Sequence, residues 1–210
     1  MKQLYPDLWQ SKRYSSGILN THAYLLRHPD GNILIYNTGD SEDLDHIELL
    51  GGVRYQLLSH RDEAGESLKR IQQRFGSILM FTKYEAVAIN HYAKADRYFN
   101  EGDYQLGDLT VLETPGHTDG SVCFVYQSPY GKTYLFTGDT LFQWNRKWST
   151  LVIKKAGGSE ALLVKSLLKL RRVQPDVVMS SGFVGEVGLV EPTHDEWITA
   201  IDTQITRLKG

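Results

Sequence analysis

The chain has almost no cysteine, no long apolar run and hardly any excess of charge. Its 210 residues include one cysteine, Cys123, which excludes an intrachain disulfide and a cysteine-based zinc site. Cys123 lies in the apolar segment 122–125, where a buried core thiol is expected. No segment is long enough for a transmembrane helix, and the first residues lack the apolar region of a signal peptide. We therefore expect a cytoplasmic protein without a membrane partner.

The charges of the chain nearly cancel. Lysine and arginine together number 23 and aspartate and glutamate 25, which gives a net charge of −2. Such a balance provides no electrostatic attraction for nucleic acid. We expect a small-molecule substrate or ligand and no nucleic-acid partner, and nothing in the sequence predicts the oligomeric state.

Hydrophobic patterning predicts a mixture of strands and helices in one domain, residues 1–210. Strands are expected at residues 17–26, 33–36, 54–58, 77–81, 109–112, 121–126, 133–136 and 176–179. Helices are expected at 65–75 and 84–92, after the N-cap Ser159, and from the capping-box segment that begins at Thr193. An Asp-Gly pair at residues 30–31 predicts a hairpin. The order favours an α/β (α+β) fold with two mixed sheets face to face and helices outside.

Three segments place metal-binding side chains directly after strand-like apolar runs. They are 57–65 (LLSHRDEAG) with His60, Asp62 and Glu63, 114–121 (TPGHTDGS) with His117, and 135–140 (LFTGDT) with Asp139. Loops at the ends of strands often carry functional residues, and imidazole and carboxylate groups bind divalent metals. The pattern predicts a metal site built from three loops over a rigid sheet.

These motifs resemble the metallo-β-lactamase superfamily of hydrolases, and the likeness covers nearly the whole chain in order. The family has T/S-H-x-H-x-D-H-x-G after one strand, then T-P-G-H-T-x-G-S, then T-G-D, and a last His after a late strand. The TPGHT and TGDT segments carry the specific part of the likeness. The resemblance implies a four-layer αββα sandwich of two mixed β-sheets, with the site at one edge of the sheets.

The resemblance also assigns ligand positions. When Asp62 is placed on the family's Asp and Gly65 on its Gly, His60 takes the second His position. His117 then matches the TPGHT His and Asp139 the Asp that bridges two metals.

Several family positions are altered in this chain. The first His position holds Leu58, which cannot bind metal, and the third holds Glu63, which can bind through oxygen. No His follows the late strand, where residues 180–185 read SSGFVG, and Asn37 stands where the family usually has Asp.

The reduced ligand set favours one metal ion over two. His60, His117 and Asp139 would suffice for a mononuclear zinc site, whereas the carboxylates alone would suit a harder ion. We expect one divalent metal, zinc, with manganese or iron as alternatives, or no bound metal at all. The resemblance gives Asp62 the catalytic role of orienting or deprotonating water.

Other interpretations of the first motif remain open. Glu63 could be a carboxylate in the first turn of a helix, and Asp62 could be the N-cap of that helix. Arg61 could pair with an acid and replace the positive charge of a metal, which predicts a guanidinium near Asp62 or Asp139.

A substrate pocket is predicted near the Asp139 motif. Trp144, Arg146 and Trp148 follow that motif and could line the pocket and hold an anionic substrate. Ser181 could supply a hydroxyl. Alternatively, the aromatic residues cover the edge of the core and the basic residues are solvated.

Two functions follow from these expectations. The first is a metal-dependent hydrolase of a small ester, thioester or lactone with a degenerate, mononuclear site. The second is a non-catalytic protein of the same fold that binds a ligand or partner in the former active-site cleft.

Overall fold

The computed structural model describes all residues, 1–210, and the chain divides into two compact units. Unit 1 comprises Met1–Ser15 and Thr21–Phe99, and unit 2 comprises Ser16–Asn20 and Asn100–Gly210. None of the helices is both long and apolar enough to cross a membrane.

Unit 1 is built on a seven-stranded sheet in the order β1-β2-β5-β6-β7-β8-β9. Its strands are β1 (Lys2–Tyr5), β2 (Leu8–Gln10), β5 (Tyr24–Leu26), β6 (Ile33–Ile35), β7 (Tyr55–Leu57), β8 (Ile78–Phe81) and β9 (Arg97–Tyr98). The strands from β1 to β6 pair antiparallel, and those from β6 to β9 pair parallel. The predicted hairpin is confirmed, because Tyr24 pairs with Ile35 and Leu26 with Ile33.

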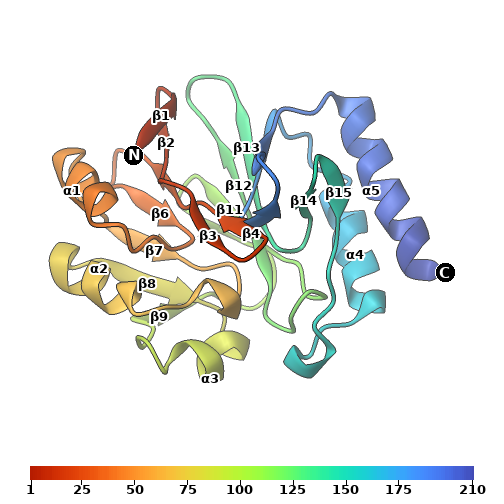
Figure 1. Cartoon of the computed structure of the whole chain (residues 1–210), viewed down its shortest axis with the longest axis horizontal. Helices are drawn as coiled ribbons and strands as arrows, with labels where there is room; N and C mark the ends of the chain where they lie inside the picture. The colour runs from red at the N-terminus through yellow and green to blue at the C-terminus, as the bar shows by residue number, and fades with distance from the viewer. The chain divides into compact units, whose positions relative to one another are not determined.

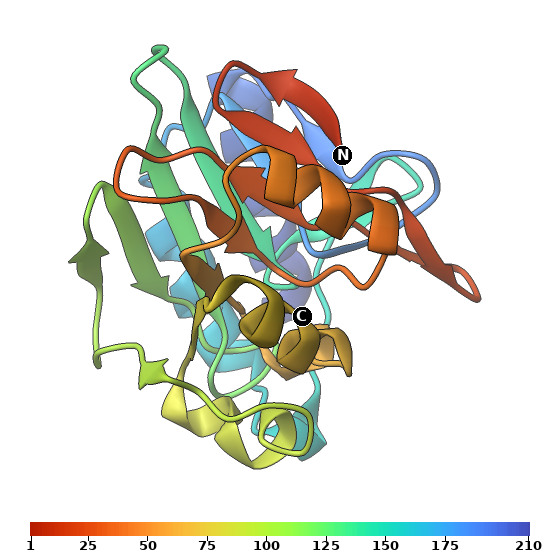
Figure 2. The ribbon, with the colours of Figure 1, turned by 90° about the vertical axis from the view of Figure 1, so that its left-hand side faces the viewer.

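Two helices cover one face of this sheet, as Figure 2 shows. They are α1 (Ser41–Leu49) and α2 (Ser67–Phe75). Arg74 of α2 binds Asp45 and Glu48 of α1, which joins the two helices. Leu68 of α2 packs into a core with Leu58 and Leu79.

Two further sheets, one six-stranded and one five-stranded, are formed mainly by residues of unit 2. The first has the order β10-β11-β12-β13-β16-β18, formed by β10 (Tyr104–Leu106), β11 (Leu109–Glu113), β12 (Val122–Gln127), β13 (Thr133–Gly138), β16 (Val177–Ser180) and β18 (Leu189–Val190). The second has the order β15-β14-β17-β4-β3, formed by β15 (Lys147–Ser149), β14 (Phe142–Trp144), β17 (Gly182–Val184), β4 (Leu19–Thr21) and β3 (Tyr14–Ser16). The sequence pattern predicts the strands of the first sheet better than those of the second.

The helices α4 (Glu160–Leu170) and α5 (His194–Lys209) run side by side in unit 2 (Figure 1). They pack on the six-stranded sheet through a core that includes Leu167 of α4, Trp197 of α5 and Cys123 of β12. The buried position of Cys123 confirms the expected core thiol. The predicted caps are also confirmed, because Ser159 accepts from Leu162 N–H and Thr193 forms a capping box with Glu196.

Two predicted elements are wrong in extent. Residues 17–26 form two strands, β4 and β5, which belong to different sheets. The predicted helix 84–92 contains only the four-residue α3 (Ala86–Ile89), preceded by a 3-10 turn. Tyr84, Val87 and Tyr92 are exposed, so the segment lacks the continuous apolar stripe that would stabilise a longer helix.

Candidate metal centre

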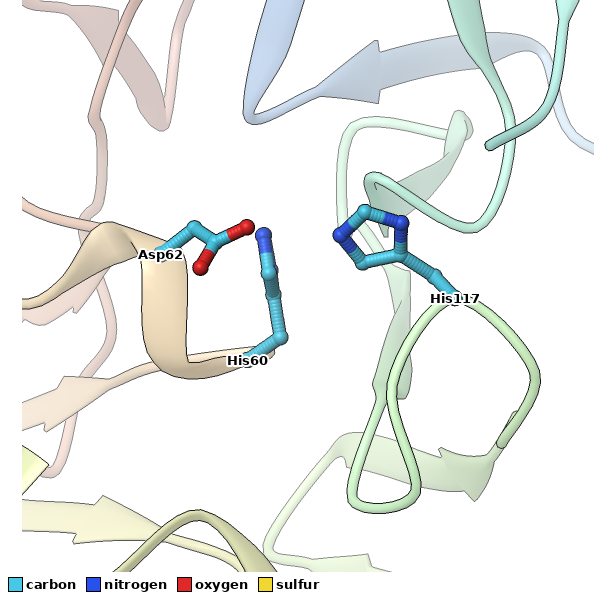
Figure 3. A group of neighbouring side chains, drawn as sticks. All are labelled: His60, Asp62 and His117. Carbon is cyan, nitrogen blue, oxygen red and sulfur yellow. The ribbon is translucent and has the colours of Figure 1, made fainter. Parts of the chain in front are cut away.

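The first motif begins at the last residue of β7, Leu57, and His60 lies three residues after it. His60 is extended and nearly inaccessible to solvent, and Asp62 lies in the following 3-10 turn, Arg61–Glu63, with an exposed side chain. Figure 3 shows the two side chains on this one turn of unit 1. One ligand atom of His60 and one of Asp62 lie within 4.8 Å of each other, close enough for both to bind one ion. The N-cap alternative for Asp62 is wrong, because α2 begins later, after Glu66.

A buried network surrounds the Nδ1 atom of His60. This atom lies 3.1 Å from Oε1 of Glu63 and 3.0 Å from Oγ of Ser59. Ser59 donates its backbone N–H to Oε2 of Glu63 at 2.8 Å and its hydroxyl to Oε1. The Ser59 hydroxyl donates its proton to Glu63, so both neighbours of Nδ1 offer hydrogen-bond acceptors.

Glu63 therefore binds within its own turn. Its carboxylate is buried in the first turn of the short 3-10 helix Arg61–Glu63 and accepts from the Ser59 backbone N–H, as the first-turn alternative predicts, and it also contacts His60. The backbone is held as well, since the Asn37 side chain donates to the Glu63 carbonyl at 3.0 Å. An aspartate at position 37 has no N–H to make this bond.

Arg61 pairs with an acid outside the motif. Its guanidinium Nε donates to the buried carboxylate of Glu85, and its NH2 group donates to the Tyr84 carbonyl. The pairing of Arg61 with an acid is confirmed, with Glu85 as the acid, and it holds the 3-10 turn against the start of α3. The position of the guanidinium near Asp62 or Asp139 stays a prediction.

The second motif places His117 in the loop after β11, in unit 2 (Figure 3). Its Nδ1 donates to the Leu151 carbonyl at 2.9 Å, which leaves the lone pair of a neutral ring on Nε2. Nε2 lies 3.9 Å from Oδ2 of Asp139, in the turn after β13. The structure thus joins His117 and Asp139, two of the predicted ligands, within unit 2.

Glycines determine the course of the His117 loop. Gly116 has φ +144°, and a Cβ there would lie 2.4 Å from Cα of Leu163 in α4. A Cβ on Gly158 would lie 2.3 Å from the His117 carbonyl oxygen. The absence of both Cβ atoms lets the loop rest directly against the start of α4.

Asp139 connects two strand ends. Its Oδ1 accepts from the backbone N–H of Gly182 at 2.9 Å, and Ser181 N–H donates to the Gly138 carbonyl at 3.1 Å. The turn after β13 is thereby tied to the segment between β16 and β17. Ser181 is buried in this segment, and it directly precedes Gly182, the partner of Asp139.

Trp144 and Arg146 lie at the tip of the β14–β15 hairpin. Asn145 and Arg146 have φ of 49° and 65°, the positive values of a two-residue hairpin turn. Trp144 is 45% exposed, and Arg146 lies 3.7 Å from Glu186 in an exposed ion pair. Trp148, in contrast, packs edge-on against Trp197, as the core-edge alternative predicts.

Two ligand positions of the family lack a histidine in this chain. Leu58, at the first His position, is fully buried in the core with Leu68 and Phe81. No histidine lies in the segment 180–185 at the end of β16.

The sequence did not reveal two partners of the histidine rings, Ser59 beside His60 and the Leu151 carbonyl beside His117. Ser59 lies inside the motif, but a backbone carbonyl of a distant loop leaves no signal in the sequence.

The sequence and the fold both resemble those of known proteins. The family described as the metallo-beta-lactamase superfamily matches residues 60–182, which is more than half of the chain. An HARLDQ-motif mutant of a metallo-beta-lactamase from Cronobacter sakazakii has a TM-score of 0.70 at 16% identity, covering 99% of this chain and 94% of that one. A metallo-beta-lactamase from Pontibacter korlensis has a TM-score of 0.69 at 18% identity, covering 97% and 98%.

A third solved structure is the metallo-beta-lactamase SMB-1 in a complex with mercaptoacetic acid. Its TM-score is 0.65 at 17% identity, and the match covers 92% of this chain and 94% of that one. Likeness at these identities concerns the fold and does not transfer a substrate. It confirms the predicted fold class.

Proposed function

Because the chain belongs to the metallo-beta-lactamase superfamily, we propose that it is a metal-dependent hydrolase with a mononuclear site. The proposed substrate is a small ester, thioester or lactone. One observation carries the proposal. The imidazole rings of His60 and His117 are each held by a contact at Nδ1, and each ring lies near a carboxylate, that of Asp62 or Asp139.

The donor set fits a divalent metal. We propose that His60, Asp62, His117 and Asp139 hold one ion, with Nε2 of each histidine as the donor atom. This proposal requires unit 1, which carries His60 and Asp62, and unit 2, which carries His117 and Asp139, to contribute ligands to the same ion. Two nitrogens and two carboxylate oxygens suit zinc, with manganese or iron as alternatives. Glu63 is left out of the proposed ligand set because its carboxylate already binds Ser59 and His60.

The residues around such an ion have separable tasks. A divalent cation, when bound, supplies Lewis-acid chemistry toward a carbonyl oxygen and lowers the pKa of nearby water. Asp62 is the one exposed carboxylate of the proposed set and is the group proposed to orient water and accept its proton. Asp139 stays bound to Gly182 N–H and holds its position beside His117.

The proposed substrate carries a negative charge. Trp144 and Arg146 present an exposed ring and guanidinium at a hairpin tip, which favours an anionic group with an apolar portion. The binding of mercaptoacetic acid by SMB-1 supports a small anionic compound as a ligand of this fold. Ser181 is proposed as a hydroxyl that lines the same pocket.

The proposal is tested by metal analysis of protein purified without chelator. We expect about one equivalent of zinc, manganese or iron per chain and hydrolysis of a panel of carboxylated esters, thioesters and lactones. His117→Ala should lose the metal and the activity, whereas His91→Ala, which changes an exposed histidine, should keep both. Circular dichroism of each variant checks that the fold is retained.

A non-catalytic binding protein is the second candidate, and the replaced ligand positions favour it. Leu58 lies in the core where the family has a His, and no His follows β16. If the folded protein takes up no metal under any loading condition and hydrolyses none of these compounds, the hydrolase proposal is wrong and the binding function stands.

A further inference from the structure

Both carboxylate oxygens of Glu63 have hydrogen-bonding partners next to His60, a proposed metal ligand. Glu63 is buried, with Oε2 accepting from Ser59 N–H at 2.8 Å and Oε1 facing both the Ser59 hydroxyl and Nδ1 of His60. A buried carboxylate without such partners would be strongly unfavourable. Its orientation is therefore fixed by the turn before any metal arrives.

We propose that Glu63 and Ser59 form a positioning pair that fixes the His60 ring as its Nδ1–H tautomer and directs Nε2 toward the metal. The inference rests on the proposed function for its metal-binding half, and the tautomer itself does not depend on metal. It replaces the prediction of Glu63 as a ligand with a different role for the same side chain.

The physical reason lies in the acceptors that surround Nδ1. The Ser59 hydroxyl gives its proton to Glu63, so His60 meets a carboxylate oxygen at 3.1 Å and a hydroxyl lone pair at 3.0 Å. Neither neighbour can donate to Nδ1, and the Nε2–H tautomer would place two acceptors against a lone pair. A carboxylate hydrogen-bonded to a ligand imidazole also makes the ring a stronger donor to the metal.

The two imidazoles of the proposed site are thus supported in different ways. His117 donates to a neutral backbone carbonyl, that of Leu151, whereas His60 donates to a charged carboxylate. The Asn37 side chain, bound to the Glu63 carbonyl, fixes the backbone that carries this carboxylate. We therefore expect the metal affinity of His60 to depend on the Glu63 side chain, whereas that of His117 depends on a backbone carbonyl.

The tautomer is measured on the metal-free protein by ¹⁵N NMR of the histidine rings. The pH is set to about 9, where a histidine of ordinary pKa near 6.5 is neutral. Signals of His60 are assigned by their absence in His60→Ala. The wild type should show the Nδ1–H form, and Glu63→Gln should raise the Nε2–H population, because an amide offers one donor group where the carboxylate offered two acceptors. A wild-type ring in the Nε2–H form would overturn the proposal, whether or not Glu63→Gln folds.

Metal affinity provides the second readout. We expect Glu63→Gln to weaken metal binding by about 10- to 100-fold, the usual effect of changing a partner of a ligand histidine. Glu48→Gln makes the same chemical change on the exposed side of α1 and should leave affinity and tautomer unchanged. Unchanged affinity in a folded Glu63→Gln protein would contradict the positioning role. A wild type that has the Nδ1–H tautomer but takes up no metal contradicts the proposed function and leaves the tautomer assignment standing.

Discussion

At the scale of single residues, Gly158 controls the position of the His117 loop. Its missing Cβ would lie 2.3 Å from the His117 carbonyl oxygen, so Gly158→Ala must displace this loop or the turn before α4. We expect the substitution to lower the free energy of unfolding by about 1–3 kcal/mol, the usual cost of overpacking. Chemical denaturation of the metal-free protein measures this.

The matched control for that substitution is Gly65→Ala. The added methyl would meet only the Asn37 side-chain nitrogen, at an ordinary 3.6 Å, so a change within about 0.5 kcal/mol is expected. Equal losses in the two variants would show that close approach at Gly158 is not what stabilises the loop.

The residues of the candidate site were partly predictable from the sequence. His117 and Asp139 sit in segments whose motif is specific, and their separation of 3.9 Å within unit 2 agrees with the prediction. The direction of the Glu63 side chain was not predictable, because it depends on a 3-10 turn that returns the carboxylate to Ser59. The same holds for Asp62, which the helix-cap alternative had placed at the start of α2.

At the scale of elements, the N-terminus of α5 makes stability depend on pH. Glu196 accepts from the Thr193 backbone N–H, and also from its hydroxyl, which lowers the pKa of the carboxyl from its ordinary value near 4.5. A lowered folded-state pKa means that the stabilisation is complete above the unfolded-state pKa and is lost as the pH falls through the folded-state value. We therefore expect Glu196→Gln to be less stable than the wild type at neutral pH and equally stable in acid.

Urea denaturation of both proteins at several pH values between about 7 and 3 measures this difference. In the Thr193→Ala background, which lacks the hydroxyl donor, the dependence on pH should be smaller. A difference between wild type and Glu196→Gln that does not change with pH would contradict the capping explanation.

Elements with a strong local signal were predictable, and those held by tertiary contacts were not. The caps of α4 and α5 and the strands β7, β8 and β11 follow from residue type and spacing. The helix α1 was missed because its sequence, SEDLDHIEL, buries few apolar residues and begins at an Asp40 cap among other acidic residues. The β14–β15 hairpin was missed because its turn, Asn145–Arg146, contains no glycine to mark the positive φ values.

At the scale of the whole molecule, the chain passes between its two units three times. It leaves unit 1 after Ser15, returns at Thr21 and leaves again after Phe99. The short segment Ser16–Asn20 is held in unit 2 through a 2.7 Å bond from the Asn20 side chain to the Gly185 carbonyl. Because neither unit is a continuous stretch of chain, we propose that residues 1–210 fold as a single cooperative domain.

Core substitutions in each unit test this cooperativity. Leu68 belongs to the buried core of unit 1 and Leu167 to that of unit 2, and both are fully buried. Leu68→Ala and Leu167→Ala should each lower the free energy of unfolding by about 2–5 kcal/mol.

Hydrogen exchange of the metal-free proteins measures whether each loss of stability reaches both units, through the slowest-exchanging amides of β7 in unit 1 and β16 in unit 2. In a single cooperative domain, either substitution reduces protection in both strands by the same factor, since those amides exchange through global unfolding. If Leu167→Ala accelerated exchange in β16 while β7 kept its wild-type protection, the units would unfold independently, and the single-domain prediction would be wrong.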